Sequence, residues 1–249
     1  MPRKRLMASL ASLALAGALT VAVPTVVASA AAPSPETSST TVEQSFVVSE
    51  AQFNQMFPNR NPFYTYSGLT AALGSYPGFT NTGDETTRRR EAAAFLANVN
   101  HETGGLVHIV EQNEANYPHY CDWSQPFGCP AGQAAYYGKG PIQLSWNYNY
   151  KAAGDALGLD LLNNPWLVQN DPAVAWQTGL WFWNTQSGAG HRPAHESIVN
   201  GHGFGETIRS INGSIECNGG NPAQVEARVS AYRNFTAILG TTPGEALYC

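Results

Sequence analysis

Residues 171–183, DPAVAWQTGLWFW, combine a helix start signal with apolar side chains on nearly every face. Asp171 is a typical N-cap residue, and Pro172 suits the first helical position because the amide hydrogen that proline lacks is unpaired there anyway. A helix that is apolar all round is buried on all sides, so the rest of the chain should pack around this one. We predict that the core contains Trp176, Trp181 and Trp183.

Three further segments carry helix signals. Apolar residues at Ala92, Phe95, Leu96 and Val99 have helical spacing, which predicts a helix over 86–101 that ends at Gly104-Gly105. Asn221-Pro222 should start a helix that runs up to Gly240, and Ser145 can cap a helix that runs to Leu157 and Gly158. Alternating strand patterns are scarce, so the predicted fold class is mainly α with long loops.

The first 30 residues have the pattern of a secretory signal peptide. Basic residues at 3–5 precede an apolar run over 6–23, and small residues at 28–30 form a cleavage pattern. A membrane anchor is the alternative, but the run is rich in alanine and broken by Gly17 and Pro24. Residues 31–45 are rich in Pro, Ser and Thr and predict a flexible linker, which leaves 46–249 as one domain. We expect a secreted, extracellular protein in which the cysteines can form disulfides.

Charge and histidine spacing limit the partners. Without the three basic residues of the leader, 10 basic and 18 acidic residues remain, a net charge of about −8. We therefore expect no nucleic acid partner and no membrane partner. His101-Glu102 starts a zinc-protease pattern, but the second histidine is replaced by Gly105. We predict no metal and no cofactor.

Glu102 is a candidate general acid. It lies seven residues after Phe95, which places it within about 20° of Phe95 on the apolar face of the predicted helix. Partial burial and the negative end of the helix macrodipole both favour the protonated form that a general acid needs. A solvated glutamate before a glycine stop is the alternative.

Arg228 falls inside the apolar stripe of the last predicted helix, between Val225 and Tyr232. Its guanidinium should therefore point inward, where it needs a carboxylate partner. Glu102 and Glu216 are the natural candidates, and a shared arginine would orient the acid.

A second carboxylate, Glu111, follows nine residues after Glu102, beyond the glycine break. Two acids on either side of such a break can face each other across a cleft, which is the arrangement that glycoside hydrolysis uses. Glu114 competes for the same role, and two ordinary surface acids in a loop remain an alternative.

The segment 134–150 gathers polar and aromatic side chains. If GPIQLS (140–145) is extended, Gln143 and Ser145 lie on one side and Ile142 and Leu144 on the other. Amides can bind sugar hydroxyl and acetamido groups, and aromatic rings offer flat faces for sugar rings. For Trp146 and Tyr148, a place in the core is the alternative. The candidate rings are Tyr136, Tyr137, Trp146, Tyr148 and Tyr150.

Together these segments resemble the family 19 glycoside hydrolases, chitinases with a lysozyme-like helical fold. The resemblance runs from about Phe46 to Cys249. It rests on FLANVNHETGG (95–105), VEQN (110–113), YYGKGPIQLSWNYNY (136–150), SINGSIEC (210–217) and RVSAYRNFTAILG (228–240). It implies a bilobal helical domain with a central substrate cleft. The compact first motif, which lacks the extra threonine of plant members, resembles the bacterial form, and we expect a catalytic domain without a chitin-binding module.

The resemblance also implies site residues. Glu102 resembles the general acid, Glu111 the base that activates water for an inverting displacement, and Ser145 the residue that holds this water. Tyr137 is a further candidate substrate contact from its aromatic ring. The sugar-binding polar groups would be Gln143, Asn149 and Asn212, with Arg228 and Glu216 as the charge network behind the acid. The implied disulfides are Cys121–Cys129 and Cys217–Cys249.

The function implied is that of a secreted, monomeric endo-chitinase. It would hydrolyse chitin and chitin oligosaccharides in chitin catabolism and cell wall macromolecule catabolism. A peptidoglycan-cleaving lysozyme or endolysin of the same fold is one alternative. A sugar-binding protein without catalysis is another, although both acids are retained in this sequence.

Overall fold

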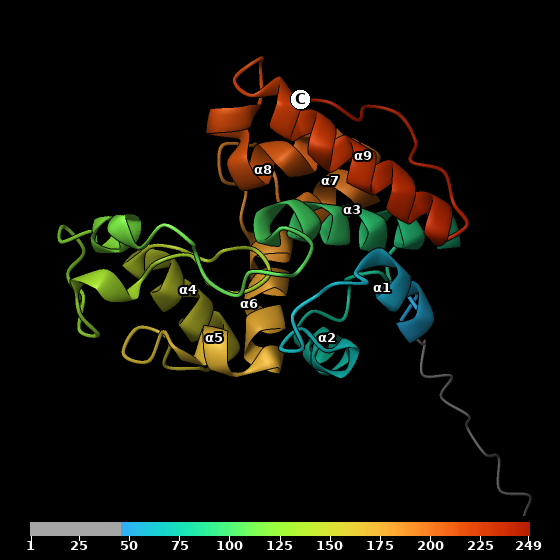
Figure 1. The fold of residues 1–249 in the computed structure, drawn as a ribbon. Coiled ribbons are helices and arrows are strands. Elements are labelled where there is room, and N and C mark those ends of the chain that lie inside the picture. Colours follow the sequence, from blue (N-terminus) through green and yellow to red (C-terminus); the bar gives the residue numbers. More distant parts are fainter. Residues whose placement is uncertain (1–45) are drawn as a thin grey trace, which may run out of the picture. The chain divides into compact units, whose positions relative to one another are not determined.

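The computed structural model describes residues 46–249, and the predicted signal peptide and linker at 1–45 lie outside the described residues. The described part is mainly helical, as predicted, and its backbone bridges are isolated ones, Val110 with Lys139 and Lys139 with Leu144. The helices (Figure 1) are α1 (Glu50–Met56), α2 (Tyr66–Ala72), α3 (Glu85–Thr103), α4 (Asn147–Leu157), α5 (Leu167–Asn170), α6 (Pro172–Thr185), α7 (Ala194–Val199), α8 (Phe204–Glu216) and α9 (Pro222–Ile238), with short 3-10 helices η1 (Leu73–Ser75), η2 (Glu114–Tyr120) and η3 (Gln133–Ala135).

Three long helices begin or end at the residues that the sequence signals indicate. The Asp171 side chain accepts hydrogen bonds from the first amides of α6, and the Asn221 side chain accepts one from the Gln224 amide at the start of α9. Helix α3 begins after Asp84, slightly earlier than predicted. It ends at Gly104, whose φ of 61° is the left-handed conformation typical of a C-terminal glycine. These helix predictions are confirmed.

Helix α6 lies between two separate hydrophobic clusters. Trp176, Leu180 and Trp183 belong to the larger cluster, which includes parts of α3 and α9, whereas Val174 and Trp181 belong to a smaller one. Figure 1 shows α6 passing between these parts of the molecule, and it packs against α2, α4, α5 and α7. Because both of its sides are covered, its nearly all-apolar sequence is explained, and the three tryptophans are buried as predicted.

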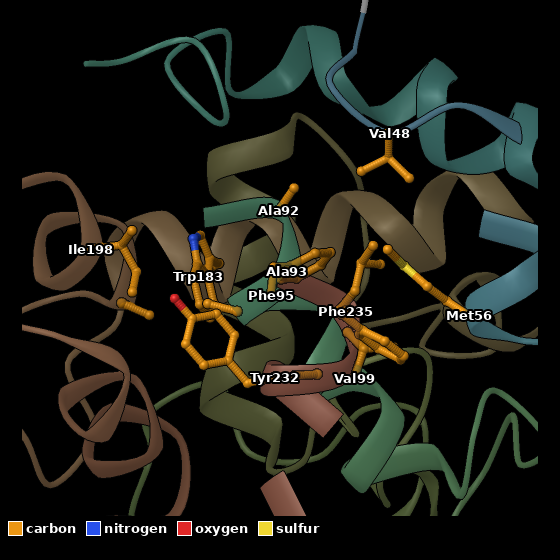
Figure 2. Packing of buried hydrophobic residues seen from close by; sticks show 14 of the residues in the cluster. Val48, Met56, Ala92, Ala93, Phe95, Val99, Trp183, Ile198, Tyr232 and Phe235 are labelled. Atoms are coloured by element: carbon orange, nitrogen blue, oxygen red, sulfur yellow. The ribbon is translucent and has the colours of Figure 1, made fainter. Parts of the chain in front are cut away.

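The larger cluster holds the long helices together. Its aromatic centre contains Phe95 of α3, whose ring meets that of Trp183 at 5.5 Å between centroids in an edge-on arrangement. Figure 2 shows Val99 of α3 near Phe235 of α9, and both residues are almost fully buried. Helix α3 packs along α9, so residues on the inner faces of these two helices are fixed relative to each other.

Two local predictions about residues 140–147 are wrong. The segment GPIQLS is a tight turn rather than an extended strand. Lys139 and Leu144 exchange backbone hydrogen bonds across it, and Gln143 has a φ of 52°. Ser145 is not the cap of α4, because its hydroxyl donates to the carbonyl of Gln143 and the helix begins at Asn147. The long-range pairing of this segment with residues 109–111 decides its shape.

Two disulfides join the pairs implied by the resemblance, Cys121 with Cys129 and Cys217 with Cys249. The first closes the loop between η2 and η3. The second ties the end of α8 to the C-terminal residue. Across residues 46–249, no helix has the combination of length and apolarity that crossing a bilayer requires.

Candidate active site

A cleft of about 530 Å³ lies between segments that pack on the two hydrophobic clusters. One wall comes from residues 138–149, which include the start of α4, together with Glu111 and Tyr120. Another comes from the C-terminal end of α3 and one side of α8. Phe182 of α6 also reaches it. The lining residues are Glu102, Glu111, Tyr120, Gly138, Ile142, Gln143, Leu144, Ser145, Trp146, Asn149, Phe182, Ile211, Asn212 and Ile215.

Glu102 lies at the C-terminal end of α3, where its carboxylate contacts the Arg228 guanidinium. Arg228 is fully buried and also donates to Glu216 through Nε (2.8 Å) and Nη2 (2.7 Å). Its remaining nitrogen, Nη1, donates to Asn98 Oδ1 at 3.1 Å. The inward Arg228 and its two carboxylate partners are confirmed. Of the two carboxylates that Arg228 binds, only Glu102 lines the cleft, and 18% of its side chain is exposed.

Within this cluster, Glu216 and Arg228 each favour the ionised form of the other. Burial by itself would raise the pKa of Glu216, but the hydrogen bond and charge of Arg228 outweigh burial and hold that pKa below its usual value. Burial also acts to lower the pKa of Arg228, and the two carboxylates more than reverse this effect. Burial, together with the Arg228 charge, lowers the pKa of His101, which therefore stays neutral beside the cluster at pH 7.

Glu111 is held in place by backbone pairing with the turn at 138–144. Its amide donates to the Gly138 carbonyl at 2.9 Å, and the Gly140 amide donates to the Ile109 carbonyl at 2.8 Å. One carboxylate oxygen, Oε1, accepts a hydrogen bond from Asn116 at 2.8 Å. Glu114, the competing candidate, is exposed and is not part of the cleft wall.

Tyr120 lies beside Glu111 on the cleft wall. Its ring meets the Trp146 ring edge-on at 5.6 Å, and the neighbouring Cys121 disulfide fixes the chain there. Burial, with further contributions from hydrogen bonding to the Glu111 carboxylate and from its charge, raises the pKa of Tyr120 to about 12. Tyr120 therefore keeps its proton at neutral pH and can donate it in a hydrogen bond.

The predicted polar groups Gln143, Asn149 and Asn212 all line the cleft with Ser145. Each amide nitrogen is used within the protein: Gln143 donates to the Gly140 carbonyl, Asn149 to the Ser145 carbonyl, and Asn212 to Glu216. Within residues 46–249 no protein donor contacts the three amide oxygens, which leaves them as acceptors for a ligand. A Cβ added at Gly138 would lie 2.9 Å from Gln143 Oε1, so a larger residue there would displace the Gln143 side chain.

Tyr137 does not fit the role of a sugar platform. Its ring stacks on Tyr117 with 3.7 Å between centroids, and the Lys139 ammonium lies 3.4 Å from the same centroid. Two groups this close cannot share one face, so both faces are covered, and Tyr137 is buried outside the cleft lining. Burial lowers the pKa of Lys139 to about 7. The prediction of a free Tyr137 ring is therefore wrong.

Several lining residues were not singled out by the sequence patterns. Ile215 is 61% exposed although aliphatic, and it follows Ile211 by one helical turn on α8. Phe182 lies on the helix that is predicted to be buried on all sides, yet it reaches the cleft. The exposure of Ile215 can be recognised only once the orientation of α8 is known, because the rest of that helix buries its apolar side. Among the described residues, no three His, Cys, Asp or Glu side chains gather as a metal site requires.

The chain matches a protein-family model described as "Chitinase class I" over residues 47–249. Endochitinase A of Zea mays is 47% identical over 188 residues, which are 75% of this chain and 63% of the maize protein. The chain thus spans less than two thirds of that relative's length.

Solved structures are also similar. The crystal structure of a bacterial family 19 chitinase is 72% identical, with a TM-score of 0.81 over 82% of this chain and 100% of that one. Chitinase C from Streptomyces griseus is 71% identical, also with a TM-score of 0.81, over 82% of this chain and 81% of its own. With its helical fold and this match over nearly all described residues, the chain belongs to the family 19 glycoside hydrolases, whose members have a lysozyme-like fold.

Proposed function

We propose that this protein is an endo-acting chitinase that cleaves β-1,4-linked N-acetylglucosamine polymers with inversion at the anomeric carbon. The observation that carries the proposal is that Glu102 and Glu111, which come from different segments, line the same cleft. Relatives named as chitinases and endochitinases support the substrate class. We also propose that the protein is secreted and acts as a monomer.

Glu102 is the general acid in this proposal. Arg228 is shared by two carboxylates, and because the buried Glu216 is held ionised by Arg228, one positive charge is already balanced there. Glu102 can therefore take up and release a proton without leaving Arg228 uncompensated. A protonated Glu102 donates its proton to the glycosidic oxygen as the bond breaks.

Glu111 is the proposed base that takes a proton from the attacking water. Ser145 assists: its hydroxyl proton is used in the bond to the Gln143 carbonyl, so its oxygen can accept a hydrogen bond from that water. Inverting enzymes hold their two carboxyl groups about 6.5–9.5 Å apart, which leaves room for water between the sugar and the base.

The sugar-binding part of the cleft combines amide oxygens with apolar groups. The oxygens of Gln143, Asn149 and Asn212 would accept from sugar hydroxyl and acetamido N–H groups. Ile211 and Ile215 on one side and Trp146 on the other suit the apolar faces of the sugar rings and the acetamido methyl groups.

The test is hydrolysis of a chitin hexamer by the wild type, Glu102→Gln and Glu111→Gln. The glutamine at 102 keeps the shape and still accepts from Arg228 but has no carboxyl proton to donate, so we expect a loss on the order of 10² or more. A comparable loss is expected for Glu111→Gln. Glu114→Gln is the matched control because Glu114 is exposed and outside the cleft.

Circular dichroism of each variant checks that the fold is retained. Near-normal turnover by Glu102→Gln contradicts the acid assignment, and a large loss in Glu114→Gln with none in Glu111→Gln moves the base to Glu114. Purified peptidoglycan is assayed in parallel. Cleavage of peptidoglycan without cleavage of the chitin hexamer contradicts the proposed substrate.

A further inference from the structure

Asn116 and Tyr117, two consecutive residues of η2, both bind Glu111. The Asn116 amide nitrogen donates to Glu111 Oε1 at 2.8 Å, and the Tyr117 hydroxyl donates to the Glu111 backbone carbonyl at 2.9 Å. The chain thus turns back within six residues and holds both the carboxylate and the main chain of Glu111. Neither residue lines the cleft, so neither is placed to contact a substrate there.

The segment that carries these two residues is itself held against the rest of the fold. The Tyr117 ring stacks on Tyr137 at an angle of 9° between planes, and the Tyr137 hydroxyl donates to Gln169 at 2.8 Å. On its other face Tyr137 is covered by the ammonium of the fully buried Lys139. The segment that carries Asn116 is therefore fixed by contacts on both faces of the Tyr137 ring. A residue that orients a reacting group needs a rigid position of this kind.

The two oxygens of Glu111 have different surroundings. Oε1 accepts from Asn116, whereas Oε2 is buried and accepts no hydrogen bond of good geometry among residues 46–249, although the protonated Tyr120 hydroxyl lies beside this carboxylate. A buried acceptor without a donor costs free energy, and such groups concentrate where function needs them. A general base needs its carboxylate held in a fixed direction, within hydrogen-bond reach of the water.

We propose that Asn116 is a positioning residue that, by donating to Oε1, fixes the direction of the Glu111 carboxylate that takes the proton from the nucleophilic water. This inference rests on the proposed role of Glu111 as base. The O–H bond of the water breaks as its oxygen bonds to the anomeric carbon, the proton goes to the Glu111 carboxylate, and Glu102 supplies the proton that leaves with the departing sugar.

A neutral amide suits this task better than a charged side chain. A hydrogen bond from a neutral donor favours the charged form of a carboxylate only modestly, so an amide can orient the carboxylate without opposing proton transfer. A lysine or arginine would favour that form much more strongly and oppose the proton transfer, and an aspartate would repel the carboxylate.

The experiment measures pH profiles of kcat and KM for wild type, Asn116→Ala and Asn116→Asp on the chitin hexamer. We expect kcat of Asn116→Ala to fall about tenfold or more, with KM within about twofold, because substrate contacts are unchanged and only the base is misoriented. The acid limb of the kcat profile should move to higher pH, since a donor to the charged carboxylate is lost. The nearly isosteric Asn116→Asp should shift that limb further.

Asn113→Ala is the matched control, because Asn113 is exposed, lies just before η2 and makes no side-chain cap bond. It should behave as wild type. Unchanged kcat in both Asn116 variants contradicts the inference. So does a lower kcat with an unmoved acid limb, because a residue that only supports the fold gives that pattern.

Glu111→Gln in the same assay separates two kinds of failure. If Glu111→Gln is inactive while both Asn116 variants turn over normally, only the role of Asn116 is rejected. If Glu111→Gln is as active as wild type, the assignment of the base itself fails. Circular dichroism identifies any variant that does not fold, and Asn116→Asp then provides the measurement in place of Asn116→Ala.

Discussion

Arg228 shows how one buried side chain can serve both stability and the site. Its guanidinium is fully buried, donates to Glu216, Glu102 and Asn98, and so joins α9 to both α8 and α3. The two carboxylates alone would repel each other in surroundings with little water. Removing one partner of a buried ion pair is therefore far more costly than removing a surface pair.

Arg228→Met should lower the free energy of unfolding by about 3–5 kcal/mol, because it leaves buried Glu216 without its cation. Urea denaturation measures this. Arg233→Met is the matched control on the same helix: the Arg233 side chain is 48% exposed, and its contact with Glu226 is 3.9 Å long. The control should change stability by about 0.5 kcal/mol or less. Equal losses in the two variants contradict the account of the buried cluster.

Some site residues could be predicted from the sequence because helical periodicity determines their direction. Arg228 lies within an apolar stripe, and Glu102 lies two turns after Phe95, so both inward orientations follow from spacing alone. The environments of Tyr137 and Asn116 do not follow from spacing. They depend on η2 folding back onto the turn at 138–144, which involves contacts between residues distant in sequence.

At the scale of helices, Glu91 joins α3 to α6 and α7. The carboxylate is fully buried and accepts from the Trp183 ring nitrogen at 3.0 Å and from the Thr80 amide at 2.8 Å. His195 Nδ1 of α7 lies 2.6 Å from the same carboxylate. The hydrogen bond with Glu91, which outweighs the opposing effect of burial, raises the pKa of His195 above its usual value of 6.5.

This contact makes stability depend on pH. Because the pKa of His195 is higher in the folded than in the unfolded protein, the charged pair stabilises the fold fully below about pH 6.5, and the contribution is lost as pH rises through the folded-state pKa. We expect His195→Gln to cost about 1.5–3 kcal/mol at about pH 6 and clearly less at about pH 9. Urea denaturation of both proteins at both pH values tests this, and a cost that grows with pH contradicts it.

The boundaries of some helices can be predicted from the sequence, whereas the turn at 138–144 is harder to predict. Helices α6 and α9 start at a cap residue followed by proline, and α3 ends at a glycine. These boundaries can therefore be predicted from a few neighbouring residues. The turn at 138–144 is different. It contains Gly140-Pro141, which is a local turn signal, but the shape of the turn also depends on pairing with residues 109–111.

At the scale of the whole described domain, the cleft exists because the chain builds two hydrophobic clusters around one shared helix. Helix α6 contributes to both, and Phe182 on that helix reaches the cleft between them. Glu102 comes from an element of the larger cluster, whereas Glu111 and the turn at 138–144 lie on the opposite side. The relative position of the two acids is thereby determined by core packing rather than by flexible loops.

In the proposed mechanism, these two acids hydrolyse chitin by a single displacement. Time-resolved analysis of the anomers released from a chitin hexamer tests it most directly, because it reports bond cleavage and stereochemistry together. Cleavage of internal β-1,4 linkages should first release products with the α configuration at the new reducing end, which later equilibrate. Initial release of β-anomers, or no cleavage of the hexamer at all, contradicts the account.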